Sequence, residues 1–113
     1  MLLASPVVAS AHHSFAVFDH TRQTSISGTV KDFQWANPHC WIDLMVAGDD
    51  GSSVQWSLEG GSPNILVRNG WKRTALKPGD RVSVLLYPLK TGLPGGSFLE
   101  VHKADGTVLF YHG

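Results

Sequence analysis

The stretch TSISGTVKDFQWA, residues 24–36, alternates apolar or β-branched residues with polar ones and carries Gly28 in its interior. Alternation with a period of two predicts a strand with one buried face. A glycine inside a strand often marks a β-bulge or a tight bend. We therefore expect a bulged first strand, which is what a small five-stranded barrel requires.

Two further alternating segments follow, HCWIDLMV (39–46) and SVQWSLE (53–59), and the turn sequence GDDG (48–51) separates them. A turn of this kind between alternating segments predicts a β-hairpin. In the first of the two segments, one face carries the apolar set Cys40, Ile42, Leu44 and Val46. We expect that face to lie in the core, with Cys40 as a small buried apolar residue rather than a ligand.

Residues 60–71 have a different pattern. Ser62 is a suitable N-cap, Pro63 suits the first helical position, and Gly70 can end the helix in the left-handed conformation. This segment is therefore expected to form a helix of about two turns. After it, residues 76–89 are expected to form a turn and a strand, and residues 97–113 a hairpin around Asp105-Gly106.

The order of these elements predicts an all-β protein with small helical content. We expect a five- to six-stranded OB-like Greek-key barrel with one short helix between the third and fourth strands. A β-sandwich is the alternative, although five or six strands are few for one. The chain has 113 residues, which is enough for one domain.

The balanced charge and the lack of known catalytic motifs argue against several classes of function. The chain has 9 basic and 9 acidic side chains, so its formal net charge is zero. A nucleic-acid or anionic-membrane binder would show a basic excess, so neither partner is expected. There is no Walker loop, nucleophile elbow, H-E-x-x-H or CxxC, and we do not expect an enzyme. The expected partner is a small ligand or another exported protein.

The first eleven residues, MLLASPVVASA, resemble the end of a secretory signal. The apolar run ends in Ala9-Ser10-Ala11, which fits the small-x-small cleavage pattern. The run is too short to span a bilayer, and an N-terminal arm packed on the domain is the alternative. We expect residues 1–11 to be a signal-peptide remnant and residues 12–113 a single OB-like β-barrel domain. The localisation expected is periplasmic or secreted.

Six histidines are many for a chain of this length, and two of them, His12 and His13, follow the apolar run directly. Cleavage after Ala11 would give His12 a free amino nitrogen beside its ring nitrogen, a donor set that suits Cu(II). Cleavage after Ser10 would start the chain with Ala11-His12-His13, and an exposed terminus with histidine third can bind Cu(II) or Ni(II) in a square plane through deprotonated backbone nitrogens. A polar start to the mature chain, without a physiological metal, is the alternative.

A third candidate ligand, His39, lies in the sequence WANPHCW. Asp43 shares its expected face, and Glu59 points the same way if the two strands pair. We expect Asp43 and Glu59 not to bind the metal themselves but to orient an imidazole that does, as carboxylates commonly do at metal sites. The alternative is a turn in which the ring of His39 caps free backbone groups.

A pocket without metal is also possible. Trp35 and Trp41 flank the Asn37-Pro38-His39 turn and could line a pocket for an apolar or aromatic ligand, with core or rim packing as the alternative. The backbone N–H groups near Ser62 and Asn64 could hold an anion. The ligand-binding residues expected for this second function are Trp35, Asn37, Trp41, Ser62 and Asn64.

Four separated motifs, AHHSFAVFD, GTVKDFQWANPH, WSLEGGSPNILVRNGWKRTALKPGDRV and YPLKTGLPGG, occur here in order. Together they resemble a family of small exported bacterial proteins, the domain of unknown function 6152. The resemblance implies export, a single β-rich domain and histidines directly after the cleavage site. Cys40 departs from the family pattern as we expect it. The motif positions that the resemblance singles out are His12, His13, Ser14, Phe15, Asn37, Pro38, His39, Glu59, Ser62, Pro63 and Asn64.

The sequence thus leaves three functions open. The first is an exported domain that binds a transition metal, with copper as the expected cofactor and His12, His13 and His39 as ligands. The second is the non-metal binding module. The third is an enzyme that uses His39 and Glu59 as a proton-transfer pair, which requires the two side chains within hydrogen-bond reach inside a cleft.

Overall fold

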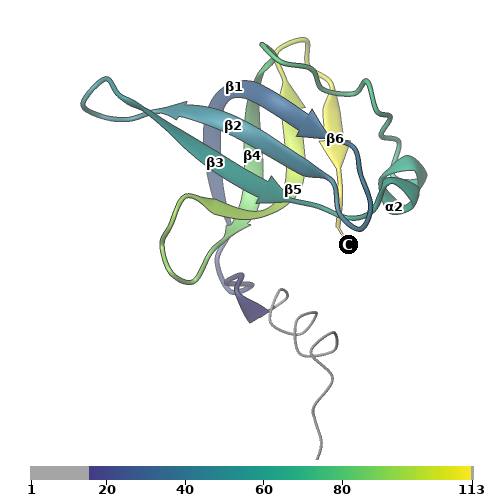
Figure 1. The fold of residues 1–113 in the computed structure, drawn as a ribbon, viewed down its shortest axis with the longest axis horizontal. Helices are drawn as coiled ribbons and strands as arrows, with labels where there is room; N and C mark the ends of the chain where they lie inside the picture. Colours follow the sequence, from purple (N-terminus) through teal and green to yellow (C-terminus); the bar gives the residue numbers. More distant parts are fainter. Residues whose placement is uncertain (1–15, 113) are drawn as a thin grey trace, which may run out of the picture.

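A computed structural model describes residues 16–112 as a closed five-stranded β-barrel with one additional strand and one short helix (Figure 1). The strands follow the order β3-β2-β1-β4-β5-β6, and β3 also pairs with β5, which closes the barrel. The expected fold class, with the helix between the third and fourth strands, is confirmed. The elements are β1 (Thr24–Gln34), β2 (Trp41–Ala47), β3 (Ser53–Glu59), α2 (Pro63–Arg68), β4 (Arg81–Pro88), β5 (Gly95–Lys103) and β6 (Val108–Phe110).

Strand β1 pairs with two neighbouring strands, as we expect for the bulged first strand of the barrel. Its first half pairs with β4, and its second half pairs with β2. The bulge lies between Val30 and Asp32 rather than at Gly28. Gly28 has a different role, because a Cβ there would lie 2.3 Å from the carbonyl oxygen of Met45. The glycine therefore permits close approach of β1 to β2, and the bend follows three residues later.

The core fills the barrel with the inward-facing residues of every strand. Cys40, Ile42 and Leu44 are fully buried, as the alternation in β2 predicts. The buried apolar set is Phe18, Val30, Cys40, Ile42, Leu44, Leu58, Leu66, Trp71, Leu76, Val82, Val84, Leu86, Phe98 and Val101. Trp56 is half-buried and packs against this set. Because inward and outward residues alternate, the neighbours of Leu58 and Phe98 in sequence face outward.

Helix α2 begins where the sequence predicts. The Ser62 side chain accepts a hydrogen bond from the backbone N–H of Ile65, and Pro63 occupies the first turn. Leu66 is buried in the core. After the helix, the Trp71 indole packs on Phe98 with 5.2 Å between ring centroids. Its N–H donates to the carbonyl of Phe110 over 2.8 Å, which ties the segment after α2 to β6.

The β2–β3 ladder continues beyond the strand ends, and this extension positions the Asn37-Pro38-His39 turn. The backbone N–H of Cys40 donates to Gly61, and that of Gly60 donates to Cys40. Glycine is needed at both positions of β3's continuation. A Cβ at Gly60 would lie 2.0 Å from the Phe98 ring, and one at Gly61 would lie 2.9 Å from the Tyr111 hydroxyl. The turn therefore lies directly beside the end of β3.

We expect Gly60→Ala to destabilise the protein by about 2 kcal/mol, because the added methyl overlaps the buried Phe98 ring and forces it from its place. Urea denaturation of wild type, Gly60→Ala, Phe98→Leu and the double variant would measure this. The Phe98→Leu change should cost less in the Gly60→Ala background, since the smaller side chain relieves the overlap. Additive losses would contradict the assigned contact.

Burial, and secondarily the charge of Glu59, raise the pKa of the Tyr111 phenol. A raised folded-state pKa means that the stability associated with this group is present below the unfolded pKa of about 10 and is lost as the pH rises beyond it. Tyr111→Phe should therefore lose less stability than wild type when urea midpoints at pH 9 and pH 11 are compared. Equal losses in the two proteins would contradict this assignment.

Candidate functional site

A pocket of about 660 Å³ lies on the outer wall of the barrel. We call it the histidine pocket. It is lined by Phe18, His20, Gln23, His39, Glu59, Gly60, Leu85, Tyr87, Ser97, Leu99, Glu100, Tyr111 and His112. These residues come from the N-terminal segment, the turn before β2, the outer faces of β3, β4 and β5, and the end of the chain after β6.

Strand pairing brings the floor of the histidine pocket together. Glu59 in β3 pairs with Ser97 in β5, and Ser97 pairs in turn with Tyr87 in β4. Next along the same strands, Leu85 pairs with Glu100. Three strands thus place polar and aromatic side chains side by side on one outward surface, in a pattern set by the barrel topology.

His39 and Glu59 form the central polar contact of this pocket. The Nδ1 atom of His39 lies in hydrogen-bond contact with Oε2 of Glu59. The Glu59 side chain is 11% exposed and the His39 side chain is 44% exposed. An ionised carboxylate can only accept a hydrogen bond, so Nδ1 is the donor, and in the neutral imidazole Nε2 then keeps its lone pair. The contact therefore leaves the more exposed imidazole with one free electron-pair donor.

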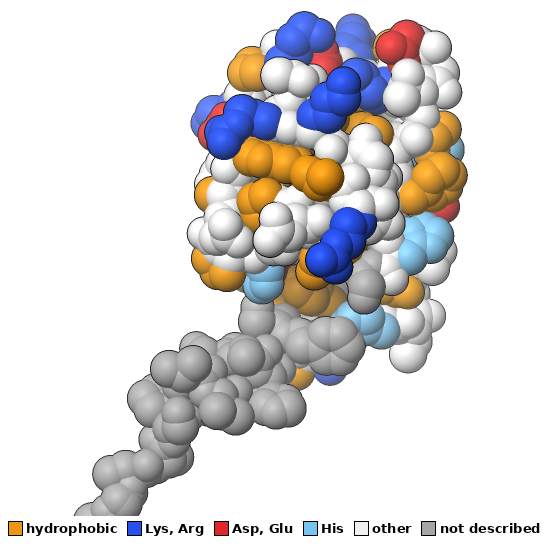
Figure 2. Space-filling model, turned by 90° about the vertical axis from the view of Figure 1, so that its right-hand side faces the viewer, with side chains coloured by type: hydrophobic (Ala, Val, Ile, Leu, Met, Phe, Trp, Pro, Cys, Tyr) orange, Lys and Arg blue, Asp and Glu red, His pale blue; other side chains and the backbone are white. Residues whose placement is uncertain are grey.

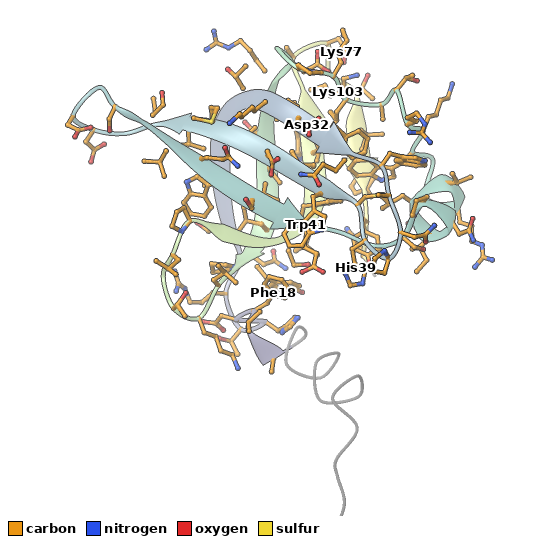
Figure 3. All side chains as sticks on the ribbon, in the orientation of Figure 1. Phe18, Asp32, His39, Trp41, Lys77 and Lys103 are labelled. Carbon is orange, nitrogen blue, oxygen red and sulfur yellow. The ribbon has the colours of Figure 1, made fainter. Side chains whose placement is uncertain are left out.

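The N-terminal segment enters at the rim of the histidine pocket. Phe18 is buried, lines the pocket and forms a β-bridge with Leu89 just beyond β4. Two backbone hydrogen bonds flank that bridge, from Asp19 to Pro88 over 2.8 Å and from Lys90 to Val17 over 2.9 Å. Figure 3 shows Phe18 and His39 at the same end of the barrel. The segment is therefore attached beside His39.

A second carboxylate, Glu100, lies on another wall of the histidine pocket. Its Oε1 lies 2.9 Å from Nε2 of His102, and its Oε2 lies 4.0 Å from Nε2 of His112. His112 lines the pocket, whereas His102 faces the neighbouring surface. On the opposite side, His20 packs against Tyr87 with 4.8 Å between ring centroids. Histidines from three separate regions of the chain therefore surround one hollow.

The structure separates the candidate site residues into two groups. It brings His39 and Glu59 together. Asp43 lies elsewhere on β2, where its carboxylate accepts a hydrogen bond from Gln34 over 2.9 Å. His12, His13 and the expected signal-peptide remnant, residues 1–11, lie outside the described residues. The metal roles of these histidines therefore stay predictions.

The residues predicted for a non-metal pocket do not line the histidine pocket. Trp35 packs against Phe33 and the core, with 5.8 Å between the two ring centroids. Trp41 is half-buried in β2, Ser62 caps α2, and Asn37 and Asn64 are exposed. The aromatic walls are instead formed by Phe18, Tyr87 and Tyr111. Sequence reasoning missed these three because they come together only through the barrel topology.

The described residues contain neither a preformed metal-binding cluster nor a membrane-spanning helix. Within residues 16–112, no three His, Cys, Asp or Glu side chains are close enough together to hold a metal ion. No helix in that same range is long and apolar enough to cross a membrane.

Comparison with known proteins places the chain in a family. The model of a family of unknown function, DUF6152, matches residues 1–98, which confirms the resemblance drawn from the four motifs. Searches of curated proteins and of solved structures returned no match. The matched range includes the N-terminal histidines, the turn at His39 and the carboxylate of Glu59. The protein therefore belongs to the DUF6152 family of unknown function.

Proposed function

We propose that this protein is an exported copper-binding module whose metal is held by His39 together with His12 and His13 of the processed N-terminus. The observation that carries the proposal is the contact between His39 Nδ1 and the buried carboxylate of Glu59. Histidines that ligate metals commonly donate their other ring N–H to a carboxylate, which fixes the tautomer and raises the basicity of the ligating nitrogen. Glu59 supports His39 in this way.

The position of the N-terminal segment supports a shared site. Phe18 is held at the rim of the histidine pocket and lies six positions after His12. A segment of six residues reaches at most about 20 Å when extended. His12 and His13 are therefore within chain reach of the pocket in which His39 lies. Processing at Ala11 would add the amino nitrogen of His12 to the donor set.

The donor set explains the choice of metal. A terminal amine with two or three imidazoles is an all-nitrogen set, and Cu(II) binds such sets strongly in square-planar or T-shaped geometry. Cys40 does not contribute a thiolate, because it is fully buried in the core and burial raises the pKa of its thiol. The role that follows is capture or delivery of copper outside the cytoplasm.

A proton-transfer enzyme is the second candidate, since His39 and Glu59 do meet in hydrogen-bond contact inside a hollow. We rank it lower because the chain carries no nucleophile motif beside this pair. The copper proposal uses the same pair and also gives a role to the histidines that follow the expected cleavage point. A purely apolar ligand fits less well, because two carboxylates and three imidazoles line the pocket.

Copper titration of the exported, processed protein tests the proposal. We expect wild type to bind one Cu(II) tightly, and Glu59→Gln to weaken binding about 10- to 100-fold, since loss of a supporting carboxylate has that effect at metal sites. His39→Ala should weaken binding at least as much. His102→Ala is the matched control, because this imidazole also contacts a glutamate but lies outside the histidine pocket. Competition with a chelator of known affinity gives the constants.

A glycine added before the processed N-terminus provides a second arm of the same experiment. If the terminus and His39 share one metal, the losses from this extension and from His39→Ala should be far from additive. Electron paramagnetic resonance of the Cu(II) forms should show the same change in nitrogen ligation in both. Binding by His39→Ala equal to that of wild type would overturn the shared site and leave the terminus as an independent chelator.

A further inference from the structure

A second hollow, of about 550 Å³, lies on the outer wall of the barrel over β1 and β4. We call it the hydroxyl groove. Four hydroxyl side chains line it, Ser27 and Thr29 from β1, Ser53 from β3 and Ser83 from β4. Register places Ser27 opposite Ser83 and Thr29 opposite Arg81, so donors of two strands lie side by side. The proposed copper function does not use this groove.

Every charged side chain that lines the hydroxyl groove is basic. Arg81 and Lys103 line it, and no Asp or Glu does. Among residues 16–112, Arg81 forms no ion pair or hydrogen bond through its side chain, so its guanidinium is uncompensated. The Lys103 ammonium donates one hydrogen bond to the carbonyl of Ala75 over 2.9 Å, which holds it in place and leaves two N–H groups.

The hydroxyl pair at the centre of the groove adds a directed donor. The Oγ atoms of Ser27 and Ser83 lie 2.8 Å apart and share one hydrogen bond. Whichever serine accepts that bond retains its own hydroxyl hydrogen, which can donate to a ligand. A guanidinium fork beside neutral hydroxyl donors is the chemistry that recognises an oxyanion, since the fork matches two oxygens of a carboxylate or phosphate.

The surrounding charge favours the same ligand. In Figure 2 most of the Lys and Arg side chains lie over the upper end of the molecule with Asp and Glu side chains between them, and His side chains lie mainly lower. Figure 3 places Lys77 and Lys103 together at the end away from His39. Asp80 pairs with Lys77 at 3.1 Å and so compensates one of these cations. Lys103 also lowers the pKa of Asp80 and Asp105 through its charge, whereas no described carboxylate pairs with Arg81, whose charge therefore attracts anions toward the groove.

We propose that the hydroxyl groove binds a small oxyanion, a phosphate or carboxylate group, with Arg81 as the principal recognition residue and the Ser27–Ser83 pair as hydroxyl donors. Phosphate and carboxylate share the recognised chemistry, two oxygens that accept from one guanidinium. The site is on a part of the barrel wall that adjoins the histidine pocket but uses other side chains, and it does not require a metal. It therefore adds a second ligand site to the protein.

Nuclear magnetic resonance titration of the full processed protein, stripped of metal with a chelator, tests this site. One arm uses inorganic phosphate and the other malonate, both at constant ionic strength against chloride. We expect saturable shifts of the amides of residues 27–29 and 81–83. Arg81→Gln should weaken binding about tenfold, the effect of losing a charged hydrogen-bond partner. Arg22→Gln, an exposed arginine outside the groove, should bind as wild type does.

The phosphate and malonate titrations distinguish the two ligand groups, because the anion that binds more tightly identifies the group that the groove prefers. Shifts that do not saturate, or equal affinities of wild type and Arg81→Gln, would overturn the proposal. Ser83→Ala gives an independent check, since it removes a donor without changing charge and should weaken binding by a smaller factor. Failure here leaves the copper proposal intact, because the titration contains no metal and probes a different surface.

Discussion

Closure of the barrel depends on three parallel residue pairs between β3 and β5, and two glycines allow them to form. Gly95 and Gly96 pair with Ser57 and Leu58. A Cβ at Gly96 would lie 2.4 Å from the carbonyl oxygen of Tyr87, and one at Gly95 would lie 2.9 Å from the Leu89 side chain. Three strands can therefore converge only where both residues lack side chains. The next pair along, Glu59 with Ser97, lies on the floor of the histidine pocket.

The same closure explains why a glutamate is tolerated in a nearly buried position. Glu59 faces outward from β3, yet the turn at His39 and the ring of Tyr111 lie over that surface. A buried carboxylate without a partner would be costly, and His39 supplies the hydrogen bond that offsets the loss of water. The pair thus stabilises the fold and is also available for chemistry, since the Nε2 atom of His39 takes no part in the contact.

Sequence alone predicted the elements and the fold, because alternation, the Ser62 cap and the turn residues are local signals. It also predicted that Glu59 points to the side of His39, since the turn that contains His39 leads into β2, which pairs with β3. It did not predict the rest of the pocket. Tyr87 and Ser97 meet Glu59 only through the parallel β3–β5 pairing, and His112 arrives from the other end of the chain. Such contacts depend on topology, which periodicity does not encode.

The two proposed ligand sites divide the barrel wall by charge. Carboxylates and imidazoles lie around the histidine pocket, whereas hydroxyls and the cations Arg81 and Lys103 lie around the hydroxyl groove. Glu100 and His102 form the boundary, because the glutamate lines the first hollow, the histidine lines the second, and 2.9 Å separates their side-chain atoms. A cation and an anion could therefore be bound on neighbouring surfaces of one small domain without competition for the same side chains.

The protonation state of the His39 ring tests the central claim most directly. Nitrogen-15 resonance of the metal-free protein distinguishes a protonated ring nitrogen from a bare one. The account predicts a proton on Nδ1, held by Glu59, and a bare Nε2 whose resonance is broadened away by one equivalent of paramagnetic Cu(II). A proton on Nε2 in the metal-free protein, or an Nε2 resonance that Cu(II) leaves unchanged, would contradict it.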